Sequence, residues 1–176
     1  MQLPDNISIA TIQHIKELNA LVNSAYRGET SKQGWTTEAD ILDGIRTDEE
    51  GLKETIEREN SWILIYTNIE NKIVACVHLE KHNHKLYLGM LTVAPHLQGR
   101  GTGKLLLNVA ENFAINLQCK TIYMTVITNR TELIAWYEKY GYINTHELKP
   151  FPENNPRFGL PKKKLMFTVL EKTLLT

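Results

Sequence analysis

The residues of this chain that are best suited to chemistry form one glycine-rich segment, Gln98-Gly99-Arg100-Gly101-Thr102-Gly103-Lys104. An apolar run precedes it at 86–93, and a helix-patterned run follows at 104–117. Glycine lets a backbone turn tightly with its N–H groups uncovered, and a helix N-terminus carries a partial positive charge. Because this combination favours phosphate, the segment predicts a ligand that carries phosphate groups.

The glycine spacing distinguishes between three known phosphate-binding motifs. A Walker P-loop requires G-x-x-x-x-G-K-[ST], but Gly99 stands too close to Gly103-Lys104, and Leu105 follows the lysine. A Rossmann turn requires G-x-G-x-x-G in the first strand–helix unit, whereas three strand-like runs precede this turn. The third design, Q/R-x-x-G-x-G/A, fits every fixed position from Gln98 to Gly103.

A second segment supports the third design. The helix-patterned run Ala135-Trp136-Tyr137-Glu138-Lys139-Tyr140-Gly141-Tyr142 ends in glycine and an aromatic residue, and Leu91-Thr92-Val93-Ala94-Pro95 leads into the glycine turn. With these segments the chain resembles the GCN5-related N-acetyltransferase (GNAT) family over almost its whole length. The resemblance implies acetyl-CoA as the acyl donor, an amine as the acceptor, and direct transfer in a ternary complex.

The resemblance also implies which residues bind the donor. Backbone amides of the glycine turn would hold the pyrophosphate, and the side chains of Arg100 and Lys104 could add charge. The pantetheine arm would lie between 90–93 and 125–127, a strand pair that splays apart in the family. Asn129 lies where some relatives contact the cofactor, and it is equally suited to cap the next helix. The implied donor-binding residues are Leu91, Thr92, Val93, Gln98, Gly99, Arg100, Gly101, Thr102, Gly103, Lys104 and Asn129.

Acyl transfer to an amine needs a base, a donor to the developing oxyanion, and an acid for the thiolate. In the family, a backbone N–H of the strand before the glycine turn supports the acyl oxygen, and Leu91 or Val93 would supply it here. Tyr137 matches the signature tyrosine, and its phenol, with an ordinary pKa of about 10, suits protonation of a thiolate. Tyr140 is the alternative acid. A core tyrosine on an amphipathic helix is the alternative role for Tyr137.

The sequence leaves open which residue acts as the base that takes the proton from the amine. Aligned on Gln98, the glutamate that some histone-acetylating relatives use falls on Tyr87. Glu80 and His78 stand two apart on a predicted strand, so their side chains face the same way. Either could accept the proton, directly or through water, or be a polar residue at a strand end. An amine of low pKa could need no strong base. The candidate catalytic residues are Tyr137, Glu80 and Leu91.

Charge is unevenly distributed along the chain. Residues 29–59 carry ten acidic and four basic side chains, whereas residues 85–176 carry twelve basic and six acidic ones. In the family, the acceptor binds around the first two helices, here residues 26–59. The acidic excess suits a cationic amine, which Trp35 could contact through its ring face. The alternative is a solvated pair of acidic helices with Trp35 as a packing residue. The loop 151–158 is expected to border the acceptor cleft.

The elements that must position these residues are predicted from periodicity and turn signals. Strands are expected at 7–10, 62–66, 73–80, 85–93, 121–127, 142–145 and 164–170. Helices are expected at 11–26, 37–46, 48–59, 104–117 and 131–140, with loops at 29–36 and 150–161. A right-handed parallel crossover is expected over 85–127. The expected fold class is α+β in α/β/α layers: a GNAT fold with a mixed, mostly antiparallel sheet of about seven strands, one splayed parallel pair and about four helices.

The bulk properties narrow the class further. The 176 residues suit one N-acetyltransferase domain over 1–176, and a formal net charge of zero argues against nucleic-acid binding. No membrane-length apolar run or secretion signal is visible, so a cytoplasmic location without membrane association is expected. Cys76 and Cys119 are expected to be buried free thiols, and His82 and His84 lack the partners of a metal site. A monomer or a homodimer is expected.

The predicted function is transfer of an acetyl group from acetyl-CoA to a primary amine of a small molecule or peptide. The alternative is an acyl-CoA-binding regulatory module without catalysis, because both would share the glycine turn. A donor with a different acyl chain is a third possibility.

Overall fold

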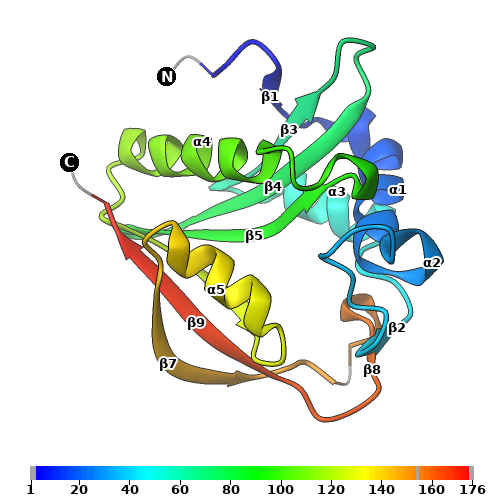
Figure 1. The fold of residues 1–176 in the computed structure, drawn as a ribbon. Helices are drawn as coiled ribbons and strands as arrows, with labels where there is room; N and C mark the ends of the chain where they lie inside the picture. The colour runs from blue at the N-terminus through cyan, green and yellow to red at the C-terminus, as the bar shows by residue number, and fades with distance from the viewer. Residues whose placement is uncertain (1–2, 154, 175–176) are drawn as a thin grey trace.

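Seven strands form one mixed sheet in the order β1-β3-β4-β5-β6-β9-β7 (Figure 1). The structure is a computed structural model that describes residues 3–153 and 155–174. Only β5 and β6 run parallel among these pairs; the other neighbours are antiparallel. The strands are β1 Ile7–Ile9, β3 Ser61–Thr67, β4 Ile73–His82, β5 Lys85–Val93, β6 Thr121–Ile127, β7 Ile143–Pro150 and β9 Met166–Thr173. A second, two-stranded sheet pairs β2 Leu42–Asp43 with β8 Leu160–Pro161.

Helices cover both faces of the sheet. The helices are α1 Ile15–Tyr26, α2 Gly28–Ser31, α3 Glu49–Glu57, α4 Thr102–Asn116 and α5 Thr131–Lys139. Alternate side chains of β3 point to opposite faces, as the period of a strand requires. Leu64 therefore packs in the cluster that holds the buried residues of α4, whereas Ile63 and Ile65 pack with those of α1 and α3. Figure 1 shows α4 crossing one side of the sheet and α3 lying behind the sheet.

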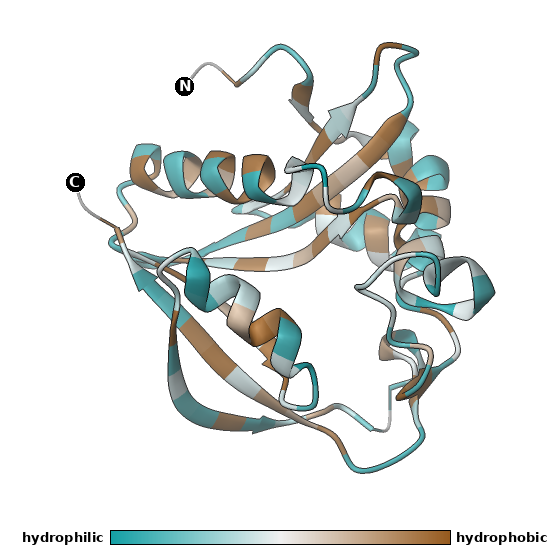
Figure 2. Cartoon of the chain, viewed as in Figure 1, coloured by the Kyte–Doolittle hydropathy of each residue, from teal (hydrophilic) through white to brown (hydrophobic). Residues whose placement is uncertain are grey.

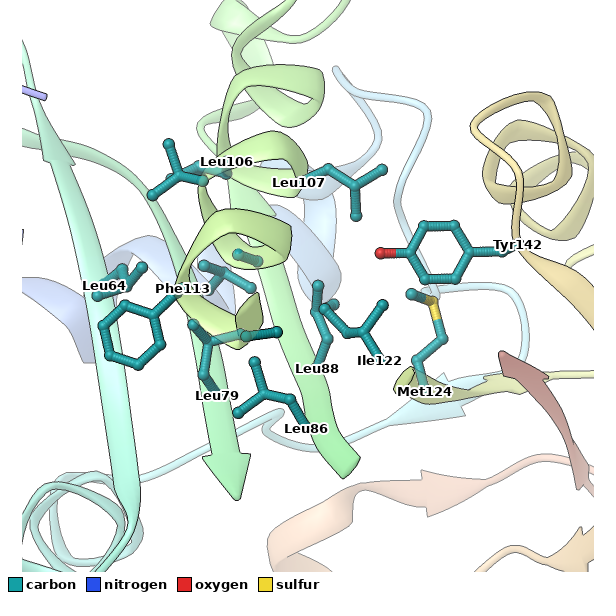
Figure 3. Packing of buried hydrophobic residues seen from close by; sticks show 14 of the residues in the cluster. Leu64, Leu79, Leu86, Leu88, Leu106, Leu107, Phe113, Ile122, Met124 and Tyr142 are labelled. Carbon is teal, nitrogen blue, oxygen red and sulfur yellow. The ribbon is translucent and has the colours of Figure 1, made fainter. Parts of the chain in front are cut away.

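The core explains why these segments adopt these elements. Leu106, Leu107 and Phe113 recur at helical spacing on α4, and all are buried against the sheet. Figure 3 shows them facing Leu79, Leu86 and Leu88 on β4 and β5. In Figure 2, brown segments repeat along α4 and the central strands, while teal segments turn outward. This packing fixes α4 over the parallel crossover and so fixes the glycine turn before it.

The mixed sheet, its single parallel pair and the crossover are confirmed. The strand predicted at 142–145 is longer and extends to Pro150. The loop predicted at 29–36 contains the short helix α2, and that predicted at 150–161 contains β8. Cys76 and Cys119 are free and buried, as expected. Among residues 3–153 and 155–174, no helix has the length and hydropathy needed to cross a membrane.

The helix predicted at 37–46 is wrong. The segment holds β2 and irregular turns, with no helix. The backbone amide of Ala39 donates to Oγ1 of Thr37, and the carbonyls of Thr36 and Thr37 accept from Arg130. Side-chain partners of this kind compete with the helical ladder. A contact from a residue more than 90 positions away cannot be read from local periodicity.

The predicted cap of α5 is also wrong. Arg130, rather than Asn129, occupies the N-cap position, and no side-chain capping bond forms there. The Arg130 guanidinium instead turns toward the segment at 35–37. Asn129 is exposed.

Candidate active site

The glycine turn joins β5 to α4 in the conformation that its sequence predicts. Gly99 and Gly101 have φ of 78° and 89°, which side chains with a Cβ rarely adopt. Gly101 is the N-cap residue of α4, and a Cβ at either glycine would meet no atom within 4 Å. The backbone is therefore uncovered at the N-terminus of a 15-residue helix, where an anion is stabilised.

The side chain of Gln98 turns away from the glycines. Its Oε1 accepts from the backbone amide of Trp35 at 2.9 Å, and its Nε2 donates to Oγ1 of Thr36 at 2.8 Å and to the carbonyl of Val93 at 3.0 Å. Gly34 lies so close that a Cβ there would overlap the Gln98 amide. Gln98 thus fastens the segment at 34–36 against the end of β5.

Removal of this amide should destabilise the fold. We expect Gln98→Ala to lower the free energy of unfolding by about 1–3 kcal/mol, because it leaves partly buried backbone and hydroxyl groups without partners. Urea denaturation measures the change, and Gln33→Ala, at an exposed position on the same segment, is the matched control. Equal stability of the two variants would contradict this role.

A first cavity, which we name the turn cavity, opens beside the glycines and has a volume of about 240 Å³. Trp136 of α5 and Tyr140, the C-cap residue of α5, line this cavity, and Trp35 contributes from the segment that Gln98 fastens. The rings of Trp35 and Trp136 lie 6.1 Å apart, and the ammonium of Lys104 lies 5.7 Å from the Tyr140 ring centroid. The lining residues are Tyr26, Trp35, Thr36, Leu91, Val93, Leu97, Gln98, Gly99, Gly101, Thr102, Gly103, Lys104, Leu133, Trp136, Tyr137 and Tyr140.

A bulge in β5 lies next to this cavity. Cys76 pairs with Thr92 and His78 pairs with Gly89, so Met90 and Leu91 together oppose one residue of β4. Met90 has φ of 50°, an uncommon value for a residue with a side chain. Bulges of this kind leave a residue unpaired and re-aim the backbone. Among the described residues, Leu91 has no Cα partner on β4 or on β6, so the ladder register leaves it out.

The bulge coincides with the opening of the parallel pair. The register of β5 with β6 ends at Tyr87 opposite Tyr123, and beyond this point the two strands separate, as the family resemblance implies. A second cavity of about 190 Å³, which we name the gap cavity, lies there between 87–91 and 124–127. Phe151, Pro152 and Phe158 of the predicted border loop line its outer part. Its charged lining residues are Arg27, Glu38, Arg46 and Arg130.

Four residues line both cavities: Tyr26, Leu91, Leu133 and Tyr137. Tyr137 is 6% exposed, and burial raises the pKa of its phenol well above the usual value, so it is protonated at neutral pH. The hydroxyl of Tyr26 donates to the carbonyl of Leu91, and burial raises the pKa of Tyr26 to about 12. A protonated phenol and the bulged strand residue Leu91 therefore lie together where the cavities join.

The two base candidates lie outside both linings. Glu80 accepts from Arg58 at 2.9 Å and lies 3.4 Å from Nε2 of His82. His78 hydrogen-bonds to Oγ of Ser61 at 2.9 Å, and burial lowers the pKa of His78 to about 4, so its ring is neutral at pH 7. Glu80 stands opposite Tyr87 in the ladder, and Tyr87 lines the gap cavity. Glu80 therefore neighbours a lining residue of that cavity without lining the cavity itself.

Of the residues predicted to bind the donor, some line the turn cavity and others line neither cavity. Leu91, Val93, Gln98, Gly99 and the run Gly101–Lys104 line the turn cavity. Thr92 is buried with its hydroxyl on the carbonyl of Met90, and neither lining includes Thr92, Arg100 or Asn129. Within residues 3–153 and 155–174, no group of three His, Cys, Asp or Glu side chains could hold a metal ion.

Three residues that line the cavities were not predicted from the sequence. Tyr26 is the last residue of α1 and belongs to neither of the two motifs. Arg130 is 6% exposed, donates to the carbonyls of 35–37 and lines the gap cavity, although its position predicts only a helix start. Arg46 lies in a segment whose acidic excess predicts the opposite charge. Their roles depend on tertiary contacts that no local pattern contains.

Comparison with known proteins settles the family. Residues 17–142 match the model of the Acetyltransferase (GNAT) family. The chain belongs to the GNAT acetyltransferases. The resemblance of the two motifs to this family is thus confirmed.

Individual GNAT relatives are distant in sequence. The chain is 29% identical over 70 residues to the "Probable spermine N(1)-acetyltransferase" of Bacillus subtilis subsp. natto (strain BEST195); the match covers 39% of this chain and 46% of that protein. The ribosomal-protein-S18-alanine N-acetyltransferase of Escherichia coli superposes with a TM-score of 0.70 at 13% identity, over 97% of this chain and 94% of that chain. Mutant forms of a spermidine/spermine N-acetyltransferase of Vibrio cholerae give 0.65 at 13% identity, over 96% and 93%. At such identities the structures show a shared GNAT fold.

Proposed function

We propose that this GNAT protein transfers an acetyl group from acetyl-CoA to a primary amine of a small molecule or peptide, directly and within a ternary complex. The observation that carries the proposal is the junction of two cavities at Leu91 and Tyr137. One cavity borders an anion-binding turn, and the other opens between separated strands. A donor with its pyrophosphate at the turn cavity would extend its pantetheine arm to Leu91, where the strand pair opens. An amine in the gap cavity would meet the acyl group there, at the groups that the reaction needs.

The turn cavity fits the donor that the family implies. The two glycines of positive φ leave open space above bare amides at the start of α4, as a pyrophosphate requires. Lys104 adds a positive charge, and Trp136 and Trp35 offer apolar walls. Acetyl-CoA supplies an acetyl group activated as a thioester.

The chain's own residues would perform two steps at the junction. The Leu91 amide would donate to the acyl oxygen as that oxygen gains negative charge. The amine nitrogen bonds to the acetyl carbon, the carbon–sulfur bond breaks, and Tyr137 would give its proton to the departing thiolate. The proton that the amine releases leaves through a base or water, and Tyr137 regains a proton from solvent.

Glu80 is the proposed base, acting through water past Tyr87. We expect Glu80→Gln to lower kcat/KM for the amine by on the order of 10–100-fold, because a base in this position removes a proton during nucleophilic attack. The dissociation constant of acetyl-CoA should not change, which equilibrium binding measures. If kcat/KM is unaltered, Glu80 has no part in the chemistry.

Release of CoA tests the function as a whole. The thiol is measured with acetyl-CoA and a panel of polyamines, amino acids, aminoglycosides and peptide N-termini. The proposal expects turnover with at least one amine class. Tight acetyl-CoA binding without turnover on any of them would favour the alternative, a binding module that has lost catalysis.

A further inference from the structure

The charged side chains that line the gap cavity are mostly basic, although residues 29–59 carry an acidic excess. Three arginines and one glutamate line the cavity: Arg27, Arg46, Arg130 and Glu38. Glu38 is held in an ion pair with Arg27, so its charge is neutralised by a lining residue. A cationic acceptor would find no unpaired carboxylate in this lining.

Five acidic residues of 29–59 pair with bases that do not line the gap cavity, whereas Glu38 pairs with Arg27, which does. Asp48, Glu50 and Glu54 surround the guanidinium of Arg157 on the surface near α3. Asp43 pairs with Lys162 at 3.2 Å, and Glu29 with Lys32 at 2.6 Å. The acidic excess of this segment therefore does not reach the gap cavity, apart from Glu38.

Two of the lining arginines keep binding capacity. Arg27 is 7% exposed and donates to Glu38 and to the Phe158 carbonyl, yet its Nε is buried without a hydrogen-bond partner among the described residues. A buried N–H of this kind is costly unless a ligand accepts from it. Arg46 forms no ion pair within residues 3–153 and 155–174, and its guanidinium lies 5.6 Å from the ring centroid of Tyr26.

Arg130 differs from the other two. Its guanidinium donates to the carbonyls of Trp35, Thr36 and Thr37, and its Nε donates to Glu132 at 2.8 Å. It is therefore a structural support for the segment at 35–37. The free positive charge of the gap cavity belongs to Arg46, with the Nε of Arg27 as a second donor.

The position of Arg46 relates this charge to the reaction. Arg46 stacks on Tyr26, and the Tyr26 hydroxyl donates to the carbonyl of Leu91 at the junction of the cavities. An acceptor whose amine lies near Leu91 and Tyr137 could thus extend an anionic group to Arg46. The rest of the lining is largely apolar, with Leu88, Met124, Val126, Phe151, Phe158 and Phe167.

We propose that the acceptor of this enzyme is an amine that also carries a carboxylate and an apolar body, and that Arg46 binds the carboxylate. Guanidinium and carboxylate match in charge and in the geometry of their hydrogen bonds. This assignment rests on the proposed amine acetyltransferase function and specifies its substrate class. Polyamines, which carry only positive charge, are poor acceptors on this account.

Matched acceptor pairs test the substrate class. CoA release is measured for apolar amino acids, for the amines that lack only their carboxylate, and for spermine. We expect kcat/KM to be about 10–100-fold higher for each amino acid than for its decarboxylated partner. Higher kcat/KM for spermine or for the decarboxylated amines would overturn the proposal.

Variants of Arg46 test the residue. Arg46→Gln should raise KM for the amino acid by about 10–100-fold without changing KM for acetyl-CoA, and Arg46→Lys should retain part of the affinity. Lys53→Gln, which removes a positive charge from exposed α3, is the control. An unchanged KM in Arg46→Gln would overturn the assignment.

Product binding keeps this result separate from the proposed catalysis. N-acetyl amino acids are titrated calorimetrically into the wild-type protein and into Arg46→Gln, with the N-acetyl amines that lack the carboxylate as controls. Binding that needs both the carboxylate and Arg46 supports the site even if no amine is turned over. Equal binding of both product types would contradict it even if turnover is found.

Discussion

Tyr137→Phe is expected to lower kcat by on the order of 100-fold or more while the dissociation constant of acetyl-CoA stays nearly constant, because general acid catalysis contributes about 10²–10⁴-fold. The change removes one hydroxyl and keeps the ring. That ring packs against Trp136 and Tyr142, with centroid distances of 5.0 and 5.8 Å, so the fold should persist. Steady-state kinetics and calorimetric titration of acetyl-CoA measure the two quantities.

The control for this substitution is Tyr142→Phe. Tyr142 is equally buried, its hydroxyl contacts Glu111 at 3.3 Å, and it lines neither cavity. This variant should retain kcat even if it loses some stability. Because burial raises the pKa of Tyr137, its proton is present across ordinary assay conditions, and the loss in Tyr137→Phe should be the same at pH 7 and pH 9. Unchanged turnover in Tyr137→Phe would exclude the tyrosine from proton transfer.

Gly101→Val is expected to weaken acetyl-CoA binding at least about tenfold, or by 1.4 kcal/mol and more. A β-branched residue is strongly disfavoured at the φ of 89° that Gly101 adopts, and its side chain would enter open space in front of the bare amides. The turn would have to change shape, which misplaces the start of α4. Equilibrium titration of acetyl-CoA measures the loss.

Backbone strain alone needs a separate control. Asn71→Val places the same side chain at φ of 59° in the turn between β3 and β4, outside both cavities. This variant should lose stability but bind acetyl-CoA as tightly as the wild type. Equal weakening in both variants would show a general loss of folded protein instead of a phosphate site at Gly101.

Local patterns predicted much of the fold, including the strand, turn and helix that carry the glycines. The apolar run before Gln98, the glycines and the amphipathic run of α4 are contiguous, so their order alone predicts a strand, a turn and a helix. The separation of β5 from β6 was expected from the family resemblance alone, and the bulge at Met90 lies where the pairing has ended. The register shift itself has no signal in the sequence, because Met90 is not a residue that favours positive φ.

The acceptor side could not be predicted in the same way. The segment at 37–46 is not helical, and the carbonyl of Thr37 accepts a hydrogen bond from Arg130. Glu38 in the same segment is paired with Arg27. Trp35, which could contact a cationic acceptor or serve as a packing residue, lines the turn cavity beside Trp136. Charge counted along the sequence therefore does not give the charge of the gap cavity. The partner of each charge decides the sign there, and those partners are distant in sequence.

The most direct test of the two-cavity account is a two-substrate initial-rate measurement. CoA release is followed while acetyl-CoA and the best amino-carboxylate acceptor are varied together. If donor and acceptor occupy adjoining cavities and the acetyl group passes directly between them at Tyr137, the double-reciprocal lines intersect. Parallel lines, with an acetylated protein detected by mass spectrometry in the absence of amine, would contradict the account.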